Sequence, residues 1–373
     1  MKNSFRLGRI FGIAIELHFS WLIVLALFSL MLAQVYFPEE LPGLEPRIYW
    51  FFGIITTLIA FTSILAHELA HSLVAIREGI SIKKIVLFIF GGVAQMKAEP
   101  DRPLAELKIT AAGPLTSIVI GLLLGTVYFL LLPRENIFSE SIFFVARLNI
   151  IVALFNLIPA FPLDGGRLLR SAIWHFGKNL LRATRVSVGI GSVLSFLAIG
   201  YGVILLFSQG NIINGLWLVF LGWMIYQAGQ SSYSQLVFQE TFAGIKVAEI
   251  MSTHPQTVSP DITLQQLAES FLEYRYGAFP VVYGSTTHGL VSLHQMKEVP
   301  REKWADTTVI SIMTPLKNCP TASPRDDTAG VMMKMAAQNE GRVLVIDGGE
   351  LVGILSRTDM MRFMQIHIIL GAE

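Results

Sequence analysis

The sequence predicts an α-helical polytopic membrane domain of six transmembrane helices with a short membrane-associated β-sheet, followed by a soluble α+β domain pair. Three observations predict this class. Of 373 residues, 53% are apolar and only 15% are charged, and most of the shortage of charge falls in the first 240. Several apolar stretches are long enough to cross a membrane. An internal repeat occupies the rest, so we expect domains at residues 1–239, 240–304 and 305–373.

Six spans are expected where about 20 mostly apolar residues follow one another. They run from Leu17 to Phe37, from Ile48 to Ile76, from Ile109 to Leu132, from near Ser141 to a break at Pro159 and Pro162, and twice through the uncharged segment between Arg185 and Glu240. The polar stretch Ser208-Gln209-Gly210-Asn211 is the expected turn within that segment. The basic segment Met1–Arg9 precedes a long apolar stretch without a small-residue cleavage site, which indicates a retained first span and not a signal peptide.

Lys and Arg residues gather in alternate loops, which predicts the orientation. They precede the first span, lie between the second and third, and lie between the fourth and fifth: Lys2, Arg6 and Arg9, then Arg77, Lys83, Lys84, Lys97, Arg102 and Lys108, then Lys178, Arg182 and Arg185. Positive loops concentrate on the cytoplasmic side. We therefore expect a multi-pass protein of the cell membrane, with both termini and the soluble domains in the cytoplasm.

The second span contains the motif His67-Glu68-Leu69-Ala70-His71. Residues four apart lie on one face of a helix, so His67 and His71 can offer two imidazoles to one zinc ion while Glu68 projects beside them. Ionisable groups are expensive inside a bilayer, and a metal site compensates for them. A chance occurrence of the motif is therefore much less favoured here than in a soluble helix.

A catalytic zinc typically has three protein ligands and one open position. The segment Asn156–Arg167 is the best source of the third, because Pro159 and Pro162 break the fourth span. Irregular backbone at membrane depth is tolerated where it is buried or lines a wet cavity. Asp164 can point into such a cavity. The alternative is a cytoplasmic loop in which Asp164 only caps the next helix.

His67–His71 together with Asn156-Leu-Ile-Pro-Ala-Phe-Pro-Leu-Asp-Gly-Gly-Arg167 closely resembles the site-2 protease family of intramembrane zinc metalloproteases. The resemblance covers roughly residues 5–230. It implies one Zn²⁺ per chain, with His67, His71 and Asp164 as metal ligands, Glu68 as catalytic base and Asn156 as a second catalytic residue. It also implies a membrane protein substrate, expected to be single-span, in a lipid bilayer. Ala112-Gly113-Pro114-Leu115 resembles the small-residue stretch of the family's third span, which we interpret as helix packing.

β-Branched and aromatic residues between Ile80 and Met96 predict two short strands with a turn around Gly91-Gly92. A strand edge beside the metal could hold an extended substrate by β-addition. The alternative is a reentrant hairpin that only packs against the second span.

The soluble part repeats at an offset of 64 residues: Thr257-Val258-Ser259-Pro260 aligns with Thr321-Ala322-Ser323-Pro324, Gly277 with Gly341, and Ser292 with Ser356. This resembles a tandem pair of CBS domains, which commonly bind adenine nucleotides. The resemblance implies a regulatory ATP, ADP or AMP site with Ser356 and Asp359, whereas Gln295 replaces the aspartate in the first copy. It also implies a homodimer through the CBS domains. The alternative is a dimerising role alone.

Several other functions are disfavoured. The net charge of +1 and the absence of a basic run exclude nucleic acid as an expected partner. A transporter gated by its CBS pair would need charged residues along several spans, which the uncharged run 186–239 lacks. A catalytically silent zinc scaffold would not need Glu68. Glu16 and His18 are expected at the membrane interface in preference to a place beside the metal.

Overall fold

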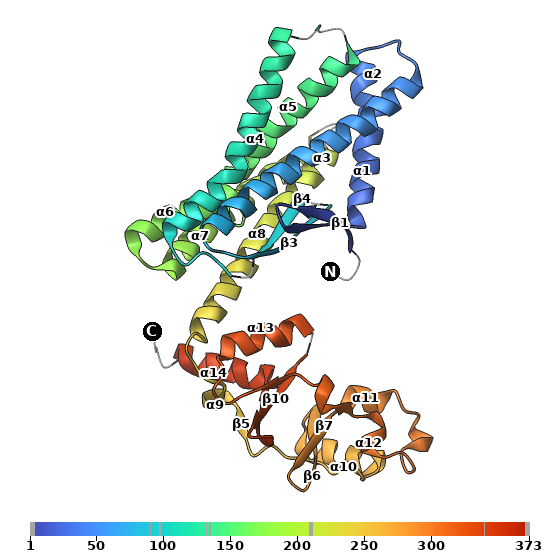
Figure 1. Ribbon diagram of the computed structural model, residues 1–373, viewed down its shortest axis with the longest axis vertical. Coiled ribbons are helices and arrows are strands. Elements are labelled where there is room, and N and C mark those ends of the chain that lie inside the picture. Colours follow the sequence, from blue (N-terminus) through green and yellow to red (C-terminus); the bar gives the residue numbers. More distant parts are fainter. Residues whose placement is uncertain are drawn as a thin grey trace. The chain divides into compact units, whose positions relative to one another are not determined.

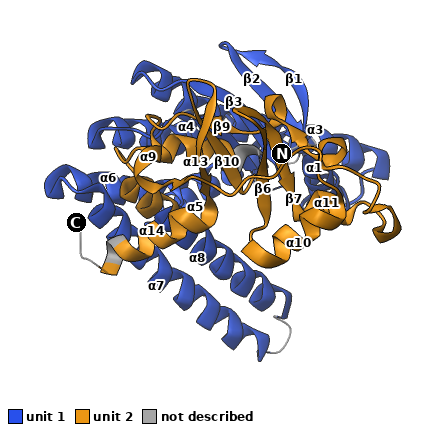
Figure 2. Ribbon diagram, turned by 90° about the horizontal axis from the view of Figure 1, so that it is seen from below, with its two compact units in different colours: residues 1–234 blue, residues 235–373 orange. Residues whose placement is uncertain are grey.

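The computed structural model describes residues 4–89, 91–96, 98–131, 133, 136–208, 212–338 and 340–369. The chain divides into two compact units, Met1–Ser234 and Gln235–Glu373, which Figure 2 shows in different colours. Each unit is described by itself.

Six helices among the described residues are long and apolar enough to cross a membrane, which confirms the predicted number of spans. The first span is continuous through α1, a π-helical turn and α2. The spans are α1–α2 (Ser20–Glu40), α3 (Pro46–Arg77), α4 (Pro103–Leu131), α5 (Ile137–Asn156), α7 (Leu180–Leu206) and α8 (Ile212–Thr241). Leu132 and the turn residues 209–211 lie outside the described residues.

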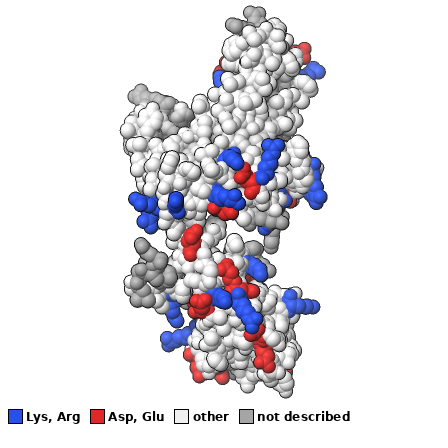
Figure 3. All heavy atoms as spheres, turned by 60° about the vertical axis from the view of Figure 1, so that its left-hand side comes forward, with Lys and Arg blue, Asp and Glu red and all other residues white. Residues whose placement is uncertain are grey.

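Unit 1 has the surface of a membrane protein. Many large apolar side chains of its helices are exposed, among them Leu122 and Leu197. On the face shown in Figure 3, the charged residues of unit 1 gather mainly at one end, a few lie at the other, and the band between is almost free of charge. This distribution matches helices whose middle parts lie in hydrocarbon.

A four-stranded sheet packs beside α1 and α3 (Figure 1). Its strands, in spatial order, are β1 (Ser4–Ile10), β2 (Ile13–His18), β3 (Ile82–Phe88) and β4 (Gly91–Met96). β2 and β3 are parallel and the outer pairs are antiparallel. The predicted strand pair between Ile80 and Met96 is present, but the chain turns earlier than expected, so that Gly91 and Gly92 belong to β4.

The N-terminal strands were not expected from the sequence. Ile13, Ile15 and Leu17 alternate with more exposed residues and bury their side chains in a cluster that includes Trp21 and Phe61. Leu17 therefore belongs to β2, and the first span begins at Ser20, three residues later than predicted.

The break after α5 positions the next helix. α5 ends at Asn156, the loop contains Pro159 and Pro162, and α6 (Asp164–Gly177) then begins. Arg170 of α6 forms an ion pair with the fully buried Glu106 of α4. Ser187 of α7 donates a hydrogen bond of 2.6 Å to the carbonyl oxygen of Gly166. Polar contacts to two spans thus hold the start of α6.

Unit 2 consists of two repeats, each with its own hydrophobic core. Its elements are α9 (Val247–Ile250), β5 (Ser252–Thr253), α10 (Leu264–Tyr274), β6 (Ala278–Tyr283), β7 (Thr286–Ser292), α11 (Leu293–Lys297), α12 (Val309–Ile312), β8 (Thr314–Pro315), β9 (Thr321–Ala322), α13 (Thr328–Gln338), β10 (Arg342–Asp347), β11 (Glu350–Ser356) and α14 (Arg357–Ile369), with short 3-10 turns at Arg301–Lys303 and Leu316–Asn318. The repeats exchange strands, because β5 joins the sheet of β9–β11 and β8 joins that of β6–β7.

Candidate metal centre

His67 and His71 project from one face of α3. Residues four apart on a helix are neighbours, and here the two Nε2 atoms lie 3.2 Å apart. Both side chains are buried. Two imidazole nitrogens at this distance can bind the same metal ion.

Helix α4 orients both rings. The Nδ1 of His71 donates a hydrogen bond of 2.7 Å to the carbonyl oxygen of Ile109, and the Nδ1 of His67 lies 2.9 Å from the hydroxyl of Ser117. Because a carbonyl can only accept, Nδ1 of His71 carries a proton, which leaves Nε2 as the nitrogen that can bind a metal ion. Contacts of this kind hold histidine ligands in most metal sites.

The carboxylate of Asp164 completes the cluster. Asp164 is the first residue of α6, whose N-cap is Leu163, and its Oδ2 lies 3.3 Å from the Nε2 of both His67 and His71. The three atoms form a nearly equilateral triangle. In a tetrahedral zinc site with bonds of about 2.0 Å, the ligand atoms lie about 3.3 Å apart. The two imidazoles, the carboxylate and their spacing therefore fit a tetrahedral zinc ion.

Gly113 of α4 gives this cluster its space. A Cβ at this position would come closer than 3.0 Å to the Nε2 of both His67 and His71. The sequence prediction assigned Gly113 only to helix packing. The close approach of α4 to the ligand atoms is a second reason for a glycine here.

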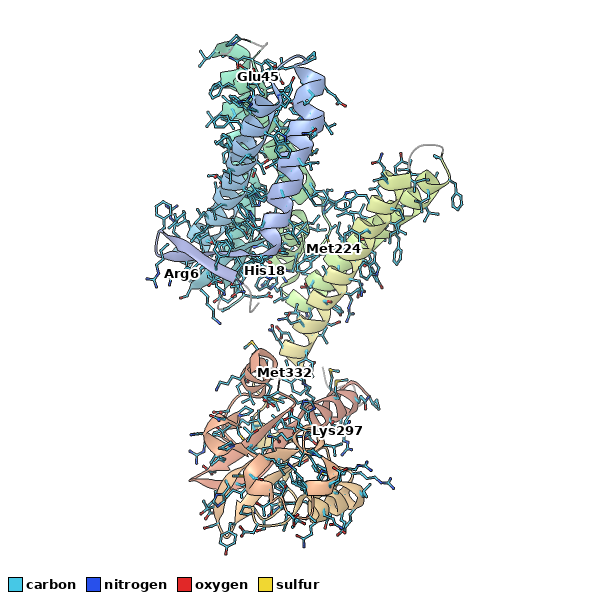
Figure 4. All side chains as sticks on the ribbon, turned by 90° about the vertical axis from the view of Figure 1, so that its right-hand side faces the viewer. Arg6, His18, Glu45, Met224, Lys297 and Met332 are labelled. Atoms are coloured by element: carbon cyan, nitrogen blue, oxygen red, sulfur yellow. The ribbon has the colours of Figure 1, made fainter. Side chains whose placement is uncertain are left out.

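A cavity of about 690 Å³ surrounds the cluster, and Glu68 and Asn156 both lie in its wall. Residues of α3, β4, α4, α5, α6 and α8 line the cavity. Gly92 of β4 packs directly against the side chain of Glu68, where a Cβ would collide with it. Met224, which also lines the cavity, lies on the side of α8 that faces the other helices (Figure 4). The structure thus brings all five predicted residues of the membrane site to one cavity.

Glu16 and His18 lie elsewhere. Glu16 of β2 accepts hydrogen bonds from Lys84 of β3 at 2.7 Å and from Ser4 of β1 at 2.6 Å. The bond from the Lys84 ammonium lowers the pKa of Glu16. His18, labelled in Figure 4, contacts Ser20 at the start of α1. Neither is among the described residues that line the cavity.

Ser356 and Asp359 of unit 2 bond to each other. Asp359 Oδ2 accepts from the backbone N–H of Ser356 at 2.9 Å, and the Ser356 hydroxyl accepts from the backbone N–H of Asp359 at 3.2 Å, which forms a capping box at the start of α14. The Ser356 hydroxyl also donates to Asp359 Oδ2 at 2.5 Å. Ser292 and Gln295 form the same arrangement at the start of α11. Helix capping therefore accounts for these contacts in both repeats, and the ligand role of Ser356 and Asp359 stays a prediction.

Arg342, at the start of β10, was missed by the sequence reasoning. Its guanidinium lies beside Gly277 of the first repeat, and burial lowers its pKa, whereas the charge of Asp359 acts in the opposite direction. Ala278 occupies the aligned position of the first repeat. This asymmetry in the repeat was a signal that could have identified Arg342.

Ile109 and Ser117 were also missed. Both lie on the face of α4 that carries Gly113, with spacings of four residues. Ser117 could have been found as a hydroxyl one helical turn after the glycine. The Ile109 contact could not, because it uses only a backbone carbonyl oxygen.

Known protein families match both units, and known proteins are similar to this chain along nearly its whole length. The model of peptidase family M50 matches residues 55–137 and 133–199, and the CBS domain model matches residues 247–301 and 309–366. Rip3 of Mycobacterium tuberculosis is 34% identical over 379 residues, which cover 100% of this chain and 96% of that protein. The zinc metalloprotease MJ0392 of Methanocaldococcus jannaschii is 33% identical over 370 residues, 98% of this chain and 97% of that protein.

Among solved structures, the site-2 protease from Methanocaldococcus jannaschii matches with 33% identity and a TM-score of 0.43, covering 61% of this chain and 94% of that one. The full-length sequence similarity extends over both units and carries the assignment. The chain is therefore a member of peptidase family M50, a multi-pass membrane zinc metalloprotease of the site-2 type with a C-terminal pair of CBS domains.

Proposed function

We propose that the chain hydrolyses peptide bonds within or near the transmembrane segment of a membrane protein substrate, with His67, His71 and Asp164 holding one zinc ion. The convergence of three donor atoms at 3.2–3.3 Å inside a cavity between membrane helices carries this proposal. When bound there, zinc supplies a Lewis acid for the scissile carbonyl and makes water nucleophilic at neutral pH.

The chain's own residues then move protons and stabilise charge. Glu68 takes the proton of the attacking water and delivers it to the nitrogen of the leaving amine. Asn156, at the end of α5, donates a hydrogen bond from its amide to the carbonyl oxygen as negative charge develops. Their positions in the wall of the cavity support both roles.

β4 is the strand that we propose binds the substrate. It is an edge strand of its sheet, and Gly91, Val93 and Met96 line the cavity. A helix buries its own peptide groups, so a substrate has to be extended before it is cleaved. An extended segment could pair with the free edge of β4 and so present its backbone to the cluster.

We propose that the termini and unit 2 are cytoplasmic and that the site lies toward that face. The even number of candidate spans among the described residues supports both ends lying on one side of the membrane. The positive loops of the predicted cytoplasmic side support the choice of side.

The proposed role of unit 2 is regulation by an adenine nucleotide bound near Arg342, Ser356 and Asp359. The half-buried Arg342 guanidinium, which has no ion pair among the described residues, supports a phosphate group as its partner. The first repeat lacks both the arginine and the aspartate at the aligned positions, which supports one competent site per chain. Pairing of two chains through unit 2 is a further part of the proposal.

Replacing Glu68 with Gln tests the protease mechanism. Purified full-length protein is reconstituted with zinc and a generic single-span substrate. We expect Glu68→Gln to retain its zinc and to lose cleavage by at least about a hundredfold, because only the proton acceptor is removed. Zinc content by atomic absorption and cleavage by gel electrophoresis measure the two effects. Cleavage at the wild-type rate would contradict the assignment.

A further inference from the structure

A second cavity of unit 1 opens between α4 and α5 on the lipid side. This groove, of about 560 Å³, is lined almost entirely by apolar and small residues, with Arg147 as its one charged side chain. Leu122 and Ile151 in its wall are 61% and 54% exposed. Because these helices cross the membrane, such exposed side chains face hydrocarbon and the groove is open to another membrane component.

Arg147 lies near the middle of α5, about 15 Å along the helix from Ile137. It is exposed, and its guanidinium carbon lies 5.4 Å from the centre of the Tyr36 ring. Among the described residues no carboxylate is within salt-bridge distance of it. The other Lys and Arg residues of the candidate spans lie near span ends: Arg47, Arg77, Lys108, Arg182 and Arg185. An arginine at this depth is costly, and an acidic partner within the membrane would offset that cost.

The groove borders the catalytic cavity at one residue of α5. Ile151 lines both, and Val152, Phe155 and Asn156 continue the wall along α5 into the cavity. A helix that lies in the groove parallel to α5 would therefore lead directly to the cavity. Arg147 is nine residues, or about 14 Å, from Asn156 along this path.

A substrate helix fits the groove better than a second copy of this chain does. The carboxylates within the spans of this chain are already engaged or lie near span ends: Glu68 lines the catalytic cavity, Glu106 pairs with Arg170, and Glu140 accepts a hydrogen bond from Tyr128. Lipid phosphates lie at the membrane surface, far from the middle of α5. An Asp or Glu inside the transmembrane helix of a substrate would match the charge of Arg147.

We propose that the α4–α5 groove docks the transmembrane helix of the substrate, and that Arg147 selects a helix with an acidic side chain within about nine residues of the cleaved bond, since an extended end covers the same path with fewer residues. This inference rests on the proposed function and names its substrate class. Gly125, where a Cβ would meet nothing within 4 Å, leaves room in the groove for the backbone of the docked helix.

Cross-linking in vesicles tests the docking separately from catalysis. The full-length chain carries Glu68→Gln to prevent cleavage and Cys319→Ser to remove its one cysteine. A new cysteine is placed in the groove as Leu122→Cys or, as a matched control on the lipid-facing side of α7, as Leu197→Cys. The probes are synthetic Leu/Ala single-span helices with one cysteine and either Glu, Gln or Lys at mid-span, in phosphatidylcholine vesicles.

We expect Leu122→Cys to form disulfides with the Glu probe about threefold to twentyfold more than with the Gln probe, the range of hydrogen bonds between membrane helices. Leu197→Cys should not distinguish the probes. Arg147→Gln should abolish the preference, and Arg147→Glu should transfer it to the Lys probe.

Equal yields for the Glu and Gln probes, or a preference that survives Arg147→Gln, would overturn the proposal. Displacement of all probes alike by phosphatidylglycerol would assign the groove to lipid phosphate, and probe-independent dimers of Leu122→Cys would assign it to a second copy; either overturns it too. None of these yields depends on cleavage, whereas cleavage by Glu68→Gln would contradict the protease mechanism alone.

Discussion

The predicted site residues of the two units are held in different ways. In unit 1, His71 and Asp164 are 93 positions apart in the sequence and lie on different helices, and their ligand atoms are 3.3 Å apart. In unit 2, Ser356 and Asp359 are three positions apart and bond to each other. In the first arrangement, three ligand atoms face one another around a shared centre, and no side chain of the protein lies at that centre to bond with all three. The second is complete without any ligand.

This difference shows which kind of pattern indicates a site. A largely buried carboxylate and two buried imidazoles that face one another are costly unless something binds between them. A Ser and an Asp at a helix start stabilise that helix, so their presence is explained locally. The proposal of a nucleotide site in unit 2 therefore needs groups that capping does not explain, and Arg342 is the clearest of these.

Asp164→Ala should have the largest effect, because it leaves two histidines to hold the metal. We expect zinc content to fall from about one per chain to below about a tenth and cleavage to become undetectable. Inductively coupled plasma spectrometry on purified protein measures the metal. Asp101→Ala, in an exposed loop, is the matched control and should keep both. Full zinc content in Asp164→Ala would show that the cluster is not the metal site.

Ser117→Ala should have an intermediate effect, because it removes only the partner of His67 Nδ1. The imidazole keeps its place but loses the contact that orients it, and changes of this kind typically cost about tenfold to a hundredfold in metal affinity. Competition with a zinc chelator gives the affinity. Thr116→Ala is the neighbouring control, since its hydroxyl bonds only within α4. Equal affinities in the two variants would show that Ser117 does not support the metal ligand His67.

The membrane spans and the metal-ligand candidates could be predicted from the sequence because they depend on patterns between residues close together in the chain. Charge-free runs define the spans, and residues four apart on one helix bring His67 and His71 together. The prolines at 159 and 162 mark the end of α5 and so place Asp164 near the break.

The rest depends on tertiary contacts. β1 and β2 were missed because Ile13–His18 runs without a break into the apolar first span, and its alternation is visible only once its partner β3 is known. The orientation of His71 by the Ile109 carbonyl leaves no trace in side-chain identity. Likewise Gly113 is ambiguous in sequence, because close helix packing and space for ligand atoms require the same residue.

Asp359→Gln should have the smallest effect of these substitutions on stability, and it tests whether unit 2 binds a nucleotide. Gln295 already completes the equivalent capping box in the first repeat, so the cap survives and the free energy of unfolding should change by less than about 0.5 kcal/mol. Asp359→Ala, which loses the cap, should cost about 1 kcal/mol. Thermal melting of the full-length protein compares the stabilities of the two variants.

If the Asp359 carboxylate also binds a nucleotide, Asp359→Gln weakens the binding of ATP, ADP or AMP about tenfold in isothermal titration while the stability is unchanged. Arg342→Gln should weaken binding by the same factor. Absence of binding heat from all three nucleotides in the wild type would show that Ser356 and Asp359 only cap a helix, as Ser292 and Gln295 do in the first repeat.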